Sequence, residues 1–240
     1  MTAKNRQFNS MKFQNLPRKE YFEGWYYKKA TLDERTVICF IPGLSISKGK
    51  TSPFMQVILA QKSGETWRQT TDWLDYADKR SQDEPFSFEV GKNCFSRDTI
   101  RIDFITDRLK VKGELSFHNM IALPTSSWAP TIMGPFSYLP AMECIHSVIS
   151  LDHTIEGILT INGDVIDFTK GKGYIEKDWG GSFPSRYIWL QSNHFKNEGS
   201  LFFSWPISLY WALSLQATSP TCTMEESTIV MRPISGAAAK

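Results

Sequence analysis

The chain has 240 residues, of which 41% are hydrophobic and 22% are charged, a composition typical of a globular protein with a large core. The formal net charge is only +2, and no basic stripe or nucleic-acid-binding motif is present, so we expect no nucleic-acid partner. No run approaches the roughly 18 to 20 apolar residues of a membrane-spanning helix, and the polar N-terminal stretch does not resemble a signal peptide. We therefore expect a cytoplasmic protein without a transmembrane segment.

Short alternations of apolar and polar residues follow one another along the chain, as is typical of β-strands. They begin at residues 35–47, continue in a hairpin over 53–70 that turns at Lys62-Ser63-Gly64, and recur four times within 86–118. Asn162-Gly163 between two apolar runs indicates a two-residue hairpin. A short helical turn within 66–80 is the one helical signal. The sequence therefore predicts an all-β barrel or sandwich.

Residues 119–146 interrupt this rhythm because they are rich in Pro, Gly and Ser, and we place a boundary or a long crossover there. The segments that start at Tyr21-Phe22-Glu23 and Tyr174-Ile175-Glu176 resemble each other, since each continues as an aromatic strand, a polar turn and an apolar strand. Two related β halves, 1–125 and 126–240, would explain this faint repeat. Chance is the alternative.

The stretch YFEGWYYK reads as an aromatic strand that carries one acid. Alternate side chains of a strand share a face, which places together Tyr21, Glu23, Trp25 and Tyr27. An unpaired acid buried among aromatic rings favours its neutral form, so it can hold a proton near neutral pH. An exposed glutamate, or one paired with an arginine, would give the same pattern.

The stretch GYIEKDWGG reads as a second strand with acids. Alternation places Tyr174, Glu176 and Asp178 on one face and the other face carries Ile175, Lys177 and Trp179. Two carboxylates on one face influence each other's titration when they are desolvated. We expect Gly180-Gly181 to form a turn that most other residues could not adopt.

The segment RYIWLQSNHF follows as another strand, and one of its faces carries Tyr187, Trp189, Gln191 and Asn193. Aromatic residues followed by two amides suit a cavity with an apolar end and a polar end. An ordinary strand whose polar end is solvated is the alternative interpretation.

Metal and nucleotide chemistry receive little support from the sequence. The histidines are scattered at 118, 146, 153 and 194, and the four cysteines show no CxxC spacing, so we expect reduced thiols. Glu143 and His146 stand three residues apart, which is a weak metal signal. No GxSxG, P-loop or dinucleotide fingerprint is present.

Two of these stretches, FEGWYYK and GYIEKDWGGSFPSRYIWLQSNHF, resemble the signature blocks of the tocopherol cyclase family. The resemblance implies a lipocalin-like β architecture with two related antiparallel barrel or sandwich halves. It also implies ring closure of a prenylated hydroquinone to a chromanol. In that reaction a prenyl double bond is protonated to a tertiary cation, which the phenolic oxygen then attacks.

Such chemistry needs an acid, a surface that stabilises a carbocation, and the exclusion of water. The acid candidates are Glu23, Glu176 and Asp178. The candidate wall and orienting residues are Trp25, Tyr26, Trp179, Trp189, Gln191 and Asn193. The resemblance implies no metal or organic cofactor, and a hydrophobic partner, either a prenylated quinol or another isoprenoid, which the protein collects by peripheral membrane contact.

Three alternatives stay open. A non-catalytic isoprenoid or prenylquinone carrier, or a hydratase of an isoprenoid double bond, would use the same scaffold, because a fold does not fix a substrate. The third is an inactive product of a degraded gene.

The sequence departs from the family pattern after Trp205. Loss of one nucleotide in the codons that follow would explain the change, since the shifted frame permits an Ala-Asp-Ile-Pro motif and a regular β pattern. In that hypothesis residues 206–240 are out of frame, and the second half lacks its last strands.

Overall fold

The computed structural model describes residues 12–14, 19–64, 66–72, 87–139, 142–196, 199–206, 212–217 and 227–231. Its large sheet is built from β1 (Tyr21–Ala30), β2 (Thr36–Ser47), β3 (Lys50–Gln61), β4 (Thr66–Asp72), β5 (Ser87–Val90), β6 (Asn93–Ser96), β7 (Thr99–Ile105), β8 (Lys110–Ile121), β9 (Cys144–Ile161), β10 (Asp164–Asp167) and β11 (Lys172–Gly180). A small sheet contains β12 (Tyr187–Ser192), β13 (Gly199–Pro206), β14 (Ala212–Ala217) and β15 (Ser227–Met231).

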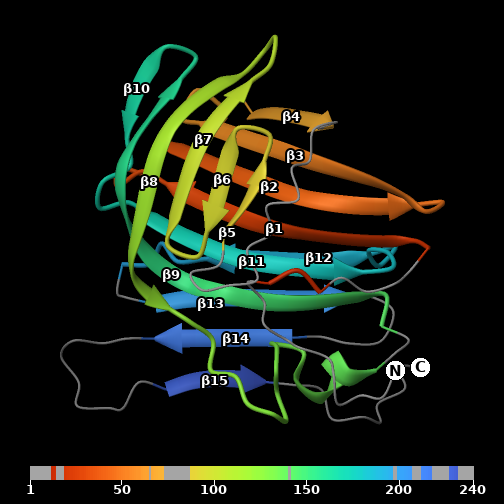
Figure 1. Ribbon diagram of the computed structural model, residues 1–240. Coiled ribbons are helices and arrows are strands. Elements are labelled where there is room, and N and C mark those ends of the chain that lie inside the picture. Colours follow the sequence, from red (N-terminus) through yellow and green to blue (C-terminus); the bar gives the residue numbers. More distant parts are fainter. Residues whose placement is uncertain are drawn as a thin grey trace.

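The large sheet is antiparallel throughout and runs in the order β4-β3-β2-β1-β11-β9-β8-β7-β6-β5, with β10 paired to β9. It curls so strongly that β5 approaches β3, which leaves the barrel nearly closed (Figure 1). The predicted all-β, lipocalin-like fold is confirmed. Strands from both sides of residue 125 share this sheet, and the division into halves stays a prediction.

Both predicted hairpins are present. β3 and β4 pair across the turn at Lys62-Ser63-Gly64, and Asn162 and Gly163 join β9 to β10 with φ of 52° and 101°. Two positive φ values belong to a type I′ turn, which suits Asn-Gly. The helical turn was wrong for Thr66–Asp72, which pairs as β4; residues 73–80 lie outside the described residues.

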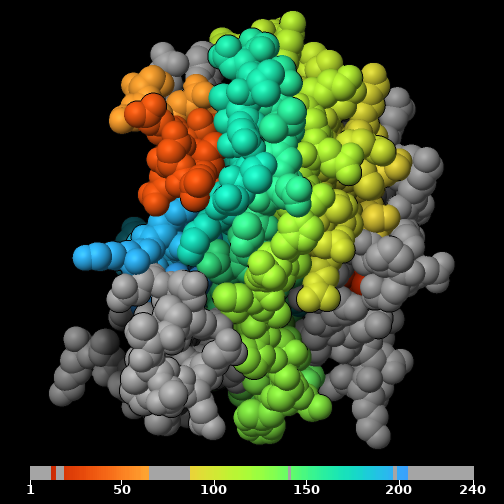
Figure 2. All heavy atoms as spheres, turned by 90° about the vertical axis from the view of Figure 1, so that its left-hand side faces the viewer, coloured from red at the N-terminus to blue at the C-terminus, as the bar shows by residue number. Residues whose placement is uncertain are grey.

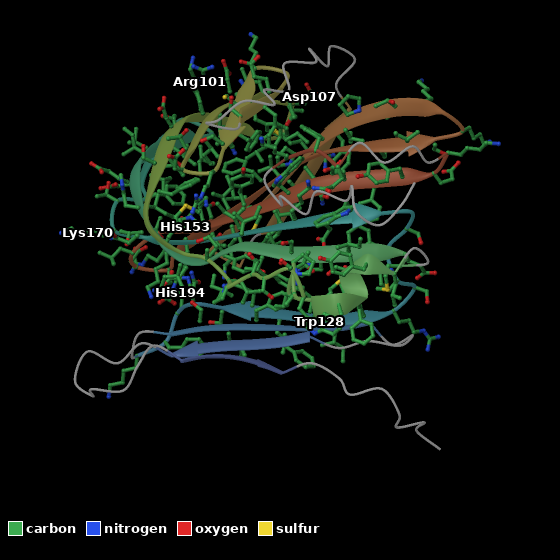
Figure 3. All side chains as sticks on the ribbon, turned by 60° about the horizontal axis from the view of Figure 1, so that its bottom comes forward. Arg101, Asp107, Trp128, His153, Lys170 and His194 are labelled. Carbon is green, nitrogen blue, oxygen red and sulfur yellow. The ribbon has the colours of Figure 1, made fainter. Side chains whose placement is uncertain are left out.

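Side chains fill the barrel, as the sticks in Figure 3 show. Fully buried aromatic residues dominate this core, among them Trp25, Tyr27, Phe40, Phe88, Phe95 and Phe104. His153 lies inside as well, with its Nε2 2.7 Å from the buried Lys29 Nζ.

The connection from β8 to β9 contains the 3-10 helix Gly134–Tyr138, within the irregular stretch expected there. The small sheet packs against the outer face of the large one, where β9, β11 and β1 present their alternate side chains (Figure 1). No described helix is long and apolar enough to cross a membrane.

Candidate active site

The nine predicted site residues divide between the two faces of the large sheet. β1 and β11 are neighbours, with Tyr26 opposite Glu176 and Gly24 opposite Asp178. The inner face receives Glu23, Trp25 and Trp179. The outer face receives Tyr26, Glu176 and Asp178, and β12 with the residue that follows it brings Trp189, Gln191 and Asn193 against them.

On the inner face, Glu23 is fully paired. Its Oε1 lies 2.5 Å from Lys177 Nζ, and the side chains are 1% and 0% exposed. The Tyr21 hydroxyl donates to its other oxygen at 2.8 Å. Burial lowers the pKa of Lys177 to about 8, although the Glu23 carboxylate opposes that shift. Glu23 is therefore held as the counterion of a buried cation.

The rings of Trp25 and Trp179 belong to the same inner cluster. Lys177 Nζ lies 4.5 Å from the centroid of one ring and 5.1 Å from that of the other, within the range of a cation–π interaction. These two residues therefore stabilise a cation of the protein itself.

On the outer face, His146 of β9 lies between the two remaining acids. Its Nδ1 contacts Asp178 Oδ1, and its Nε2 lies 3.3 Å from Glu176 Oε2. Burial would lower the pKa of His146, but the two carboxylates outweigh it and raise the pKa to about 10. His146 is thus an imidazolium at neutral pH.

Access distinguishes this outer cluster from the inner pair. The side chains of His146 and Asp178 keep 13% and 17% of their surface exposed, whereas the inner pair has at most 1%. Glu176 Oε2 also accepts hydrogen bonds from the Tyr174 hydroxyl at 2.5 Å and from Trp189 Nε1 at 3.1 Å. Of the two clusters, the outer one therefore has more side-chain surface exposed, while the His146 Nε2 atom itself is buried.

Aromatic rings surround the outer cluster. Tyr26 meets Trp189 edge to face at 5.6 Å, and Phe202 of β13 stacks on the His146 ring with centroids 4.9 Å apart. Tyr174 completes the group, with its ring 6.4 Å from that of Phe202. Aromatic faces attract cations, so the interface can stabilise positive charge next to a proton source.

The two amides behave differently. Asn193 donates from Nδ2 to Asp152 Oδ1 and to the Gly173 carbonyl, both at 2.9 Å, and thereby ties the segment after β12 to the large sheet. Gln191 accepts a hydrogen bond from Lys28 Nζ at 2.9 Å, and its own Nε2 is buried without a partner among the described residues.

The outer cluster also bears on metal binding. His146, Glu176 and Asp178 each offer one ligand atom, all within 4.8 Å of one another. One imidazole with two carboxylates is a donor set that divalent cations accept. A proton and a divalent cation would therefore compete for the same ligand atoms of this cluster.

His146, Tyr174 and Phe202 were not among the predicted site residues. The pairing of His146 with Asp178 depends on the β9–β11 register. The two residues are 32 positions apart in the sequence, so no local pattern predicts their contact. Alternation did place Tyr174 beside Glu176. The reason given for Gly180 was wrong, because its φ is not positive; a Cβ there would lie 2.0 Å from the Glu143 carbonyl oxygen, so space is what requires glycine.

A sequence profile described as tocopherol cyclase-like matches residues 82–204, just over half of the chain. The protein therefore belongs to the tocopherol cyclase-like family. The match contains the second signature block and begins after the first, and it ends one residue before Trp205. A comparison with curated proteins gives no match.

Among solved structures, a protein assigned as AttH from Nitrosomonas europaea superposes with a TM-score of 0.64 at 12% identity, over 95% of this chain and 72% of its own. CghA in complex with Sch210972 gives a TM-score of 0.53 at 11% identity, over 94% of this chain. The chain spans 60% of the length of CghA. At these identities the likeness concerns the fold alone, and it agrees with the lipocalin-like architecture.

Proposed function

We propose that this protein protonates an isoprenoid double bond, and that its reaction is the cyclisation of a prenylated hydroquinone to a chromanol. The observation that carries the proposal is the partly accessible His146, held between Glu176 and Asp178 in an interface walled by aromatic rings. Membership of the tocopherol cyclase-like family supports the same reaction class.

The first step is proton transfer from the outer cluster to the prenyl double bond. His146 contacts both carboxylates through its two ring nitrogens, so a proton can pass between the imidazolium and either carboxylate before it reaches the substrate. The new C–H bond leaves a tertiary carbocation on the substrate.

Ring closure follows at that cation. The faces of Tyr26, Trp189 and Phe202 stabilise the positive charge, and the small sheet limits the access of water that would compete for it. The phenolic oxygen forms the C–O bond and loses its proton, which returns to the cluster. Protons and electrons therefore balance without a redox partner.

Heavy water tests this mechanism directly. The protein is incubated in it with a prenylated methylhydroquinone, under reducing conditions, and the product mass is measured. A chromanol with one deuterium on the carbon next to the new C–O carbon is expected. An alcohol with one added water would instead make the protein a hydratase, and unchanged quinol that co-purifies with it would indicate a carrier.

Removing metal ions distinguishes acid catalysis by the outer cluster from catalysis by a metal bound there. We expect turnover to persist after dialysis against a chelator, because protons alone drive the proposed reaction. Loss of turnover on chelation, with recovery on adding Zn²⁺ or Mg²⁺, would contradict acid catalysis by this cluster.

Peripheral membrane contact is part of the proposal, as is location in the cytoplasm. Residues 182–190 contain one charge, Arg186, and present exposed Phe183, Tyr187 and Leu190. Such a surface suits a lipid headgroup boundary. Phe183→Ser with Leu190→Ser should reduce co-sedimentation with phosphatidylcholine vesicles several-fold, whereas the control Val165→Ser, on exposed β10, should not.

A further inference from the structure

Lys28 and Gln191 form a polar pair at one end of the aromatic interface. Lys28 extends from the outer face of β1, two residues beyond Tyr26, and its Nζ donates to Gln191 Oε1 at 2.9 Å. Gln191 Nε2 remains buried with no hydrogen-bond partner in the described part of the chain. A buried donor without an acceptor is costly and calls for an explanation, and a ligand oxygen would supply one.

Lys28 also differs from the neighbouring basic residues. Lys172 has a carboxylate partner, Asp152, at 3.2 Å, and His194 has Glu34 at 3.3 Å. Lys28 has no ion pair within 4 Å among the described residues. Burial lowers its pKa, against the opposing effects of Cys39 and Glu34. An oxygen rich in electron density would therefore be favoured beside its Nζ.

The pair lies at the opposite end of the interface from the acids. Lys28 is opposite Tyr174, Tyr26 is opposite Glu176, and Gly24 is opposite Asp178. Two residues of a strand span about 7 Å, so the Lys28 level is roughly 7 Å from the Glu176 level and about 13 Å from that of Asp178.

β12 repeats the same order, because Trp189 donates to Glu176 while Gln191, two residues further, binds Lys28. At this edge of the interface, Figure 2 shows the blue segment after β12 below the orange-red β1–β2 turn, and Figure 3 places His194 on the side of the large sheet that faces the small one.

We propose that Lys28 and Gln191 bind the second ring oxygen of the substrate, the one that does not enter the new ring. Lys28 Nζ and Gln191 Nε2 both donate to it, while the prenyl double bond lies at the His146 end. The protein therefore selects a dihydroxylated ring over a monophenol or an isoprenoid hydrocarbon. This inference rests on the proposed function, since it names the substrate feature that the same site recognises.

Binding without turnover tests the subsite. Quenching of tryptophan fluorescence gives the Kd of a prenylated hydroquinone and of the matching prenylated phenol that lacks the second hydroxyl. Wild type should bind the hydroquinone about tenfold more tightly, the value of one or two good hydrogen bonds. Gln191→Leu and Lys28→Met should bring the ratio of the two Kd values near one and leave the phenol within about twofold. The control Lys112→Met, on exposed β8, should keep the wild-type ratio.

Each result separates the subsite from the reaction. A wild-type ratio near one, a ratio unchanged in both variants, or no saturable binding of either ligand would overturn the subsite. Turnover in heavy water is measured independently on the same protein. Selective binding without any product would keep the subsite and remove the cyclase, whereas product with a ratio near one would do the reverse.

Discussion

At the residue scale, Glu23 and Glu176 come from similar Tyr-x-Glu segments and have different surroundings. Glu23 pairs with a buried lysine inside the barrel, and Glu176 lies beside the His146 imidazolium, whose side chain is partly exposed to solvent. Alternation predicts that both are enclosed by aromatic rings, but their partners come from other strands. Only those partners separate a structural acid from a candidate proton donor.

Glu23→Gln should destabilise the fold without removing the chemistry. The substitution leaves Lys177 in the core without a counterion, and breaking a buried pair in this way costs about 3–5 kcal/mol. Urea unfolding measures the loss. The double variant Glu23→Gln with Lys177→Met should recover much of it, because no charge is then buried. An unfolding free energy equal to that of wild type in the single variant would contradict the structural role.

His146 should stay protonated through neutral pH. Its pKa is raised to about 10 by Asp178 and Glu176, after burial has opposed them, and the ordinary value is about 6.5. The native state therefore holds this proton more tightly than the unfolded state. Its stabilising effect is complete below about pH 6.5 and is lost as the pH rises through about 10.

Histidine NMR checks this assignment, with His146→Gln to identify the signal. In Asp178→Asn the titration should move down toward the ordinary range, because one carboxylate is gone. A wild-type midpoint near 6.5 would show that His146 is not held as an imidazolium between the two acids.

At the element scale, the pairing of β1 with β11 builds both clusters. The period of two within each strand is readable from the sequence, and it placed Glu176 beside Asp178 and Glu23 beside Trp25 correctly. Strand pairing is not readable in this way, because β1 and β11 lie about 150 residues apart and no short-range pattern encodes their register. A slip of one residue would exchange the faces.

Gly180 holds the end of β11 in that register. Gly180→Ala should cost at least about 2 kcal/mol of stability and reduce turnover, since the Cβ would lie 2.0 Å from a backbone oxygen of Glu143 and would push β11 away from His146. Gly24→Ala is the matched control, because its Cβ would meet no atom closer than 3.5 Å. Equal unfolding free energies for the two variants would contradict this role.

At the scale of the whole molecule, the site exists only where the small sheet covers the outer face of the barrel. Phe202 and Trp189 come from the small sheet, and His146 and Glu176 come from the large one. Sequence patterns predicted most strands of the large sheet and β12 and β13 of the small one, and the resemblance predicted the lipocalin-like arrangement. No strand was predicted for the tail that forms β14 and β15. How one sheet lies on the other depends on long-range packing, which explains why the composition of the site was predicted only in part.

The segment after Trp205 supplies β14 and β15 to the small sheet, and the family match ends just before it. The frameshift hypothesis stays a prediction. Replacing residues 206–240 with the sequence of the shifted frame should raise the yield of monomeric protein in gel filtration, because strands with a regular β pattern would pair along β13 in place of β14 and β15. Sequencing the end of the gene is the direct check, and an unshifted reading frame there would reject the hypothesis.

The most direct test of the account compares the acids on the two faces. Turnover per folded molecule is measured in heavy water for Glu176→Gln, Asp178→Asn and His146→Gln, with Glu23→Gln as the control from the opposite face. We predict losses of about 10²- to 10⁴-fold for the three outer variants and a change of less than about threefold for Glu23→Gln. Loss of turnover in folded Glu23→Gln, with the outer variants active, would place the proton donor inside the barrel and contradict the account.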